Sequence, residues 1–373
     1  MVGWGLLADL VPIYPLYALM FADTGLSAAE ISGLFLIWSG VGITAEVPFG
    51  ALADRFSRRS SMVVGAGLQA LAYVVWTATP GFPGFAAGFV LWGLGGALVS
   101  GSQEALLYDG LAAAGAEEHY ARINGWVTSA GFLAQLPAAA VATVLFEAGG
   151  YQLVGWISVA GCAATALLTS RLPEPPRQDS DDSYFATLKD GLSEVTARPV
   201  VRDAALAAAL FGGLDAFEEY FPLVARDWAV PTQLIPGAMA LTALAGAAGS
   251  ALGGPAARLR TWALGLVLAV AGAALGVAAL LRAPWGLAVI VVFYGLYRAV
   301  LVVVDSRLQE RIEGSSRATV TSVASLGVEI AALLVYAAWA LGESLAVAVL
   351  FVVMAGLVPR LLRARTGQRG PRS

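Results

Sequence analysis

Long apolar segments follow one another along almost the whole sequence, and they constrain the fold more than any other feature. A helix needs about 20 apolar residues to cross about 30 Å of hydrocarbon, and the chain holds twelve such windows. We therefore predict an all-α integral membrane protein with twelve transmembrane helices, so that both ends of the chain lie on one side. The windows fall at about 3–22, 29–53, 60–79, 84–108, 122–146, 151–170, 200–224, 233–256, 261–281, 285–306, 318–341 and 345–362.

The composition fits a membrane protein and excludes several kinds of site. Of the 373 residues, 58% are hydrophobic and 13% are charged, against about 25% charged in soluble proteins. The single cysteine, Cys162, and the single histidine, His119, exclude a disulfide within the chain, a thiolate metal cluster and a histidine ligand set. No glycine-rich run continues into a nucleotide-binding loop. We expect no metal site, no cofactor and no enzymatic activity.

Basic residues mark the cytoplasmic side. Of the 22 basic residues, 19 fall in the even-numbered turns, the central loop or the C-terminal tail. Only Arg226 and Arg282 lie in the opposite loops, and Arg298 lies within a span. Because positive charge concentrates on the cytoplasmic side, we predict a multi-pass protein of the cell inner (cytoplasmic) membrane with both termini in the cytoplasm.

One long polar stretch, residues 171–198, interrupts the apolar pattern, and it carries prolines and an acidic run. We interpret it as a cytoplasmic linker between an N-terminal bundle, 1–170, and a C-terminal bundle, 199–362, with a tail at 363–373. Phe185, Leu188, Leu192 and Val195 recur at helical spacing, which predicts a short amphipathic helix on the inner leaflet. A linker without regular structure is the alternative.

Short stretches recur about 200 residues apart, which indicates two related halves. Tyr14-Pro15-Leu16 is echoed by Phe221-Pro222-Leu223, and the run at 50–54 by the run at 254–258. We predict two pseudo-symmetric six-helix bundles.

The run Gly50-Ala51-Leu52-Ala53-Asp54-Arg55-Phe56-Ser57-Arg58-Arg59 joins the second span to the third. It resembles the signature loop G-x-x-x-D-R-x-G-R-R of the major facilitator superfamily, with serine where that family has its glycine. The resemblance covers essentially the whole chain and implies a substrate site near mid-membrane between the halves. It also implies that Asp54, with Arg58 and Arg59, docks near Arg317 and stabilises an outward-open state. The matching loop residues are Gly50, Asp54, Arg55, Arg58 and Arg59.

Ionisable residues inside the spans map the interior, because a charge at the bilayer centre costs about 2.5–3.5 kcal/mol and must be hidden from lipid. Spans three, six, nine and twelve carry no charged residue before Arg360, and the resemblance makes them outer supports. The other spans carry eight acidic residues and one basic residue. A cavity lined by them would have a net negative charge, which favours cations, protons or both. The candidate cavity residues are Asp9, Glu46, Glu104, Asp215, Glu218, Glu219, Arg298, Asp305 and Glu329.

Two of these acids, Glu104 and Glu46, each have two alternative interpretations. Glu104 lies in a span-four run, 100–109, that resembles one in many bacterial exporters of the same superfamily. Its carboxyl group either binds a proton or the substrate, or it forms a structural hydrogen bond between helices. Glu46 precedes Pro48, which bends the helix. It either serves gating or proton carriage, or it is a fixed partner for span eleven.

The acids of span seven share one helical face. Asp215 and Glu219 are four residues apart and Glu218 adjoins them, so one is protonated or a cation lies between them. Alternatively, Glu219 simply reaches the outer interface. Arg298 is expected to pair with one of these acids or with Asp305, two turns further along.

These features predict a secondary transporter with a small-molecule substrate, protons and the lipid bilayer as partners, no nucleic acid, and a monomeric state. We expect a proton-coupled antiporter that exports small lipophilic or cationic compounds by alternating access. The alternative is a proton symporter or facilitator that takes up a small metabolite. A membrane receptor or accessory subunit that has the fold without transport is the third interpretation.

Overall fold

The computed structural model describes residues 1–55, 57–174, 193, 196–311 and 317–362, without the side chains of 46–55, 101, 121, 309–311, 317–319 and 321–322. Every regular element in these ranges is a helix. The residues that define the predicted linker helix, and the tail at 363–373, lie outside the described residues.

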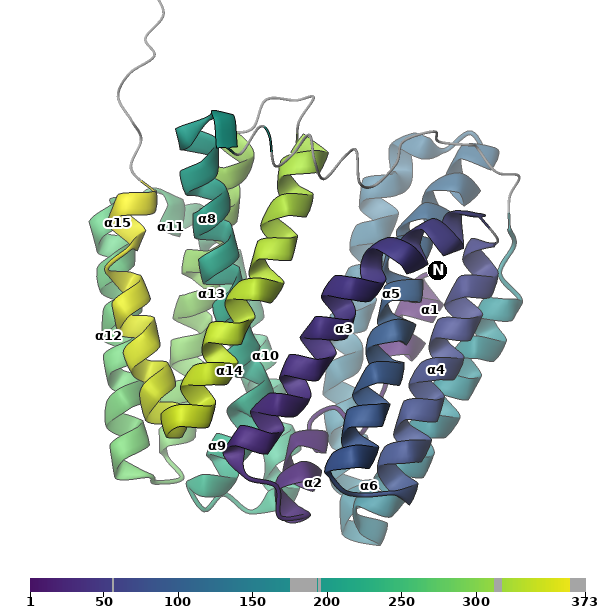
Figure 1. Ribbon diagram of the computed structural model, residues 1–373, viewed down its shortest axis with the longest axis horizontal. Coiled ribbons are helices and arrows are strands. Elements are labelled where there is room, and N and C mark those ends of the chain that lie inside the picture. The colour runs from purple at the N-terminus through teal and green to yellow at the C-terminus, as the bar shows by residue number, and fades with distance from the viewer. Residues whose placement is uncertain (56, 175–192, 194–195, 312–316, 363–373) are drawn as a thin grey trace, which may run out of the picture. The chain divides into compact units, whose positions relative to one another are not determined.

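The helices have the following bounds, and Figure 1 shows most of them with the same labels. The N-terminal ones are α1 (Val2–Asp9), α2 (Tyr17–Asp23), α3 (Ala28–Arg55), α4 (Arg58–Ala78), α5 (Phe82–Ala113), η1 (Glu117–His119) and α6 (Tyr120–Ser170). The C-terminal ones are α8 (Pro199–Gly213), η2 (Leu214–Tyr220), α9 (Phe221–Asp227), η3 (Thr232–Leu234), α10 (Ile235–Ala251), α11 (Gly253–Ala257), α12 (Thr261–Leu281), α13 (Gly286–Arg311), α14 (Arg317–Ala355) and α15 (Val358–Leu361).

Eight helices within the described ranges are long and apolar enough to cross a membrane. Two of them, α6 and α14, each supply two predicted spans, because their backbone leaves the helical conformation at Gly149 and Gly150 and at Gly342 and Glu343. In Figure 1, α14 turns back beside α12 and leads to α15. The first and seventh predicted spans are broken into shorter helices, so all twelve predicted crossings have a helical counterpart.

The first span breaks at Leu10–Leu16, although its apolar pattern runs without interruption from 3 to 22. Pro15 lacks a backbone N–H, and its ring would collide with the carbonyl four residues back if the helix continued. The freed backbone N–H of Ile13 donates instead to Ser158 Oγ at 3.1 Å, in a fully buried position. Asp9 is the last residue of α1 and therefore lies at this break.

The seventh span breaks in a corresponding place. After Gly212 and Gly213 the α-helix gives way to the tighter η2, and α9 begins just ahead of Pro222. Proline is favoured in the first turn of a helix and disfavoured further in. Asp215, the second residue of η2, thus lies at a helix break as Asp9 does.

The chain packs into two compact units, and their division does not simply follow the order of the sequence. Unit 1 comprises Met1–Tyr184 and Glu219–Ala240, and unit 2 comprises Phe185–Glu218 and Leu241–Ser373. Residues 219–240 therefore pack with the N-terminal helices, where Tyr220 Oη lies 3.0 Å from Ser32 Oγ. The predicted boundaries at 170, 198 and 362 stay a prediction.

Aromatic side chains form the core of unit 1 around α2. Phe21 packs on Phe85 and Trp76 with ring centroids 4.3 and 5.3 Å apart, and Trp76 packs on Phe89 at 4.9 Å. All four rings are fully buried. Such pairs add about 0.5–1.5 kcal/mol beyond the burial of their area, so this cluster fixes α2 against α4 and α5 after the break in the first span.

Candidate functional site

A cluster of charged and phenolic groups lies in unit 2, where η2 meets α13. Arg298 Nη1 lies 2.8 Å from Asp215 Oδ2, and Tyr294 Oη lies 3.2 Å from Asp215 Oδ1. Tyr294 is also hydrogen-bonded to Glu218. The guanidinium carbon of Arg298 lies 5.9 Å from the centroid of the Tyr294 ring. We call Asp215, Glu218, Tyr294 and Arg298 the unit 2 cluster.

The geometry of the unit 2 cluster suits one exchangeable proton. A phenol carries a single hydrogen, so Tyr294 can donate to Asp215 or to Glu218 but not to both. The second acid completes the chain by bringing a proton of its own and donating to the phenolic oxygen. With that proton the charges of these four residues sum to zero, and without it they sum to one negative charge.

Close packing of α10 against α13 places the cluster. A Cβ at Gly246 would lie 2.6 Å from the Tyr294 ring, and one at Gly249 would collide with the backbone of Gly295. These two glycines therefore let the helices approach to backbone contact. On another side of α13, Tyr297 Oη donates to the carbonyl oxygen of Phe211 at 2.7 Å, which ties α13 to α8.

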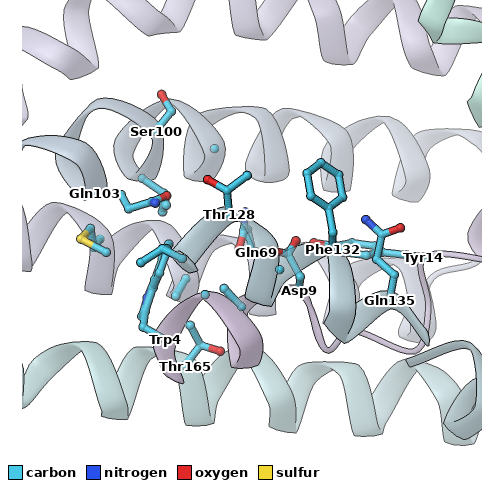
Figure 2. A pocket seen from close by; sticks show the side chains of 18 residues that line it. Trp4, Asp9, Tyr14, Gln69, Ser100, Gln103, Thr128, Phe132, Gln135 and Thr165 are labelled. Atoms are coloured by element: carbon cyan, nitrogen blue, oxygen red, sulfur yellow. The ribbon is translucent and has the colours of Figure 1, made fainter. Parts of the chain in front are cut away.

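Unit 1 contains a cavity of about 430 Å³, lined by α1, α4, α5, α6 and the break after α1 (Figure 2). Asp9 lines it together with Trp4 and Tyr14. Three further helices each present residues at i, i+4 and i+7, the spacing of one helical face. These are Met62, Ala66 and Gln69 on α4; Gly96, Ser100 and Gln103 on α5; and Thr128, Phe132 and Gln135 on α6.

Asp9 is held where a glycine leaves room for its carboxylate. A Cβ at Gly131 of α6 would collide with Asp9 Oδ2. Asp9 also lies at the carboxyl end of α1, where unpaired carbonyl groups carry partial negative charge. A proton or a bound cation is therefore a favourable neighbour for this carboxylate.

The other predicted cavity residues lie elsewhere. Glu219 belongs to unit 1, where it is hydrogen-bonded to Tyr17. Glu104 and Asp305 are exposed, and Glu329 is half-buried; none of the three lines the unit 1 cavity. The side chain of Glu46 lies outside the described residues.

The basic loop after α3 is anchored within unit 1. Arg58 forms an ion pair with Asp109 of α5, and Arg59 Nε lies 3.7 Å from Glu174 Oε2. Ser57, which stands where the family signature has glycine, caps α4 by accepting a hydrogen bond from the Ser60 N–H at 3.0 Å. The side chains of Asp54, Arg55 and Arg317, and the surroundings of Gly50, lie outside what the structure describes, so the proposed lock stays a prediction.

The distribution of charged residues in the sequence did not reveal the uncharged polar residues that line the cavity. Gln69 and Thr165 come from spans three and six, which carry no charged residue and were expected to be outer supports. The i, i+4, i+7 stripe on α4 would have revealed Gln69, because an amide inside a membrane span needs a polar neighbour; Thr165 belongs to no such stripe. Across the described residues, no group of three or more His, Cys, Asp or Glu side chains is placed to hold a metal ion.

Broken spans that carry an acid at the break are typical of membrane transporters. More particularly, the chain belongs to the Major Facilitator Superfamily, whose sequence profile matches residues 2–336. This confirms the predicted family and fold class. No curated protein matches the chain in sequence.

Solved structures of transporters share the fold. The nucleoside transporter NupG superposes with a TM-score of 0.74 at 13% identity, over 97% of this chain and 95% of that one. A D-xylose–proton symporter gives 0.71 at 17% identity, over 98% of both chains. A bacterial homologue of the human lysosomal transporter Spinster gives 0.74 at 16% identity, over 97% and 95%. At these identities the likeness concerns the fold.

Proposed function

We propose that this transporter is a proton-coupled antiporter that exports small cationic or lipophilic compounds by alternating access. It works as a monomer in the cytoplasmic membrane with both termini in the cytoplasm, as the arginine distribution suggests, and it moves its solute without chemical conversion.

The unit 2 cluster is the observation that carries the proposal. In its protonated form the chain from Glu218 through Tyr294 and Asp215 to Arg298 is neutral. Loss of the proton leaves a net negative charge, which is costly in a low-dielectric interior. The deprotonated cluster therefore favours access to water or a nearby cation, and the protonated cluster favours closure, which couples proton movement to conformation.

The energy available to such coupling is sufficient. One proton that moves through 100 mV supplies about 2.3 kcal/mol, which corresponds to roughly a fiftyfold concentration ratio of a neutral solute. A single exchangeable proton in the unit 2 cluster can thus drive useful accumulation or export.

Proton symport is the second candidate. A D-xylose–proton symporter is among the solved structures with this fold, and the neutral amides of the unit 1 cavity suit a hydroxyl-bearing solute. Antiport and symport differ in the direction in which protons move when the solute enters.

That direction is measurable in proteoliposomes with a pH-sensitive dye in the lumen. Inside and outside start at equal pH, and lipophilic cations, neutral drugs and sugars are added outside one at a time. An antiporter moves protons out as solute enters, so luminal pH rises; a symporter brings protons in, so luminal pH falls. No response to any solute in protein-containing vesicles would contradict both.

Matched variants connect the signal to the cluster. Asp215→Asn and Glu218→Gln keep the shape of each side chain but remove an ionisable group, and we expect each to lower the pH response at least tenfold. Asp203→Asn is the control, because Asp203 lies in α8 beside Arg202, outside the cluster. Wild-type responses from Asp215→Asn and Glu218→Gln would place the coupling elsewhere.

A further inference from the structure

Besides the proton-binding cluster of unit 2, unit 1 has a cavity formed within one unit by α1, α4, α5 and α6. Its volume of about 430 Å³ lies in the lower part of the range for small-molecule sites, about 300–1,000 Å³. Its lining combines aromatic rings with a few polar side chains, which is the composition of a binding site and not of a packing defect.

The charge of the cavity is one-sided. Among the described residues that line the cavity, Asp9 is the one carboxylate, and none of them is an arginine, lysine or histidine. Gly131 opens the space in which the carboxylate lies. A half-buried carboxylate without a basic side chain in its cavity favours the binding of a cation.

A second observation points to a ligand with hydrogen-bonding groups. Gln69, Gln103 and Gln135 line the cavity from three different helices. Each amide offers both donors and an acceptor. A bound molecule that carries oxygen atoms would pair with these amides, since buried polar groups are normally hydrogen-bonded.

Aromatic rings complete the wall. Trp4, Tyr14 and Phe132 all line the cavity (Figure 2), and the faces of such rings attract cations. Phe132 is 62% exposed, so its ring is free to cover a bound molecule.

We infer that the unit 1 cavity binds a small organic cation, an ammonium or guanidinium compound that also carries hydroxyl or carbonyl oxygens, with Asp9 as its counter-ion. The role of this site in export rests on the proposed function, whereas binding itself does not. The site would hold the solute within unit 1, whereas the cluster that holds the proton belongs to unit 2.

Binding is tested by calorimetric titration of the purified full-length protein in detergent. The probes are choline and its neutral carbon isostere 3,3-dimethylbutan-1-ol, with agmatine and tetraethylammonium as further cations. We expect choline to bind at least tenfold more tightly than the isostere, since a hydrogen bond or ion pair to a charged group is worth enough for that ratio. Equal affinity for the two, or no binding of any of the three cations, would overturn the inference.

Variants locate the site. Asp9→Asn should remove the preference for choline over the isostere, and Gly131→Ala should weaken choline binding because the added methyl displaces the carboxylate. Asp203→Asn should change neither. Unaltered preference in Asp9→Asn would place any cation site elsewhere. Cation binding that depends on Asp9 without any pH response in proteoliposomes would refute the proposed function and leave this site standing.

Discussion

The contact between α10 and α13 gives a prediction whose size follows from the structure. In Gly249→Ala the new Cβ collides with the carbonyl group and Cα of Gly295. Because these are backbone atoms, no change of side-chain conformation relieves the collision, and the two helices must separate. Overpacking of this kind costs about 1–3 kcal/mol, and a backbone obstacle favours the upper end of that range.

The opposing effect is helix propensity. Alanine is about 1 kcal/mol better than glycine inside a helix, so the net loss in Gly249→Ala is about 2 kcal/mol. Gly67 of α4 is the matched control, because a Cβ there meets no atom within 4 Å, and Gly67→Ala should gain about 1 kcal/mol. At roughly 1–2 °C per kcal/mol for a chain of this length, the apparent melting temperatures of the two variants should differ by about 3–6 °C.

The assay is thermal unfolding of both variants in the same detergent, together with the luminal pH response. Tyr294 and Arg298 flank Gly295 on α13 and depend on the same contact. We therefore expect Gly249→Ala to lower the pH response as well, and Gly67→Ala to leave it unchanged. Equal melting temperatures for the two variants would refute the close approach of α10 and α13.

Three further predictions concern single hydrogen bonds and ion pairs. Ser158→Ala leaves the buried N–H of Ile13 without its acceptor, which should cost about 1–3 kcal/mol and lower the melting temperature by several degrees, whereas Ser170→Ala at an exposed site should be neutral. Tyr294→Phe should abolish the pH response, because the proton chain loses its middle member; retention of the full response would exclude a relay through this phenol. Asp23→Asn removes a partner of Arg226 at 3.0 Å in an exposed pair, so we expect a melting temperature within about 2 °C of wild type.

Much of the fold could be predicted from the sequence because a membrane imposes a simple rule on helix length. Twelve apolar windows were sufficient to predict the crossings, and the helix reversals at Gly150 and Glu343 fall in the predicted gaps. Hydropathy did not reveal the broken first span, since the residues at its break are as apolar as their neighbours. In the seventh span, the acids at the break were interpreted as cavity residues and not as a sign of a break. Pro15 and Pro222 were the local signals.

The candidate site was only partly predictable. Helical spacing suggested that Asp215 and Glu218 lie near Glu219, but the structure assigns Glu219 to unit 1 beside Tyr17. The spacing of residues in the sequence does not show where the 3-10 helix η2 replaces the α-helix. This change of helix type makes these side chains point in different directions. The sequence offered several acids as partners for Arg298, and only the packing of α13 against η2 selects Asp215.

Exchange of a proton for a cation is measured most directly by the protons released when the purified protein binds choline. The measurement uses a pH-sensitive dye in weakly buffered detergent solution, repeated from about pH 5 to pH 8. If cation binding drives a proton out of the unit 2 cluster, as antiport requires, each bound choline releases up to about one proton in the pH range where that cluster is protonated, and Asp215→Asn and Glu218→Gln bind choline but release none. Proton uptake on binding, or binding without release at every pH, would contradict the antiport mechanism.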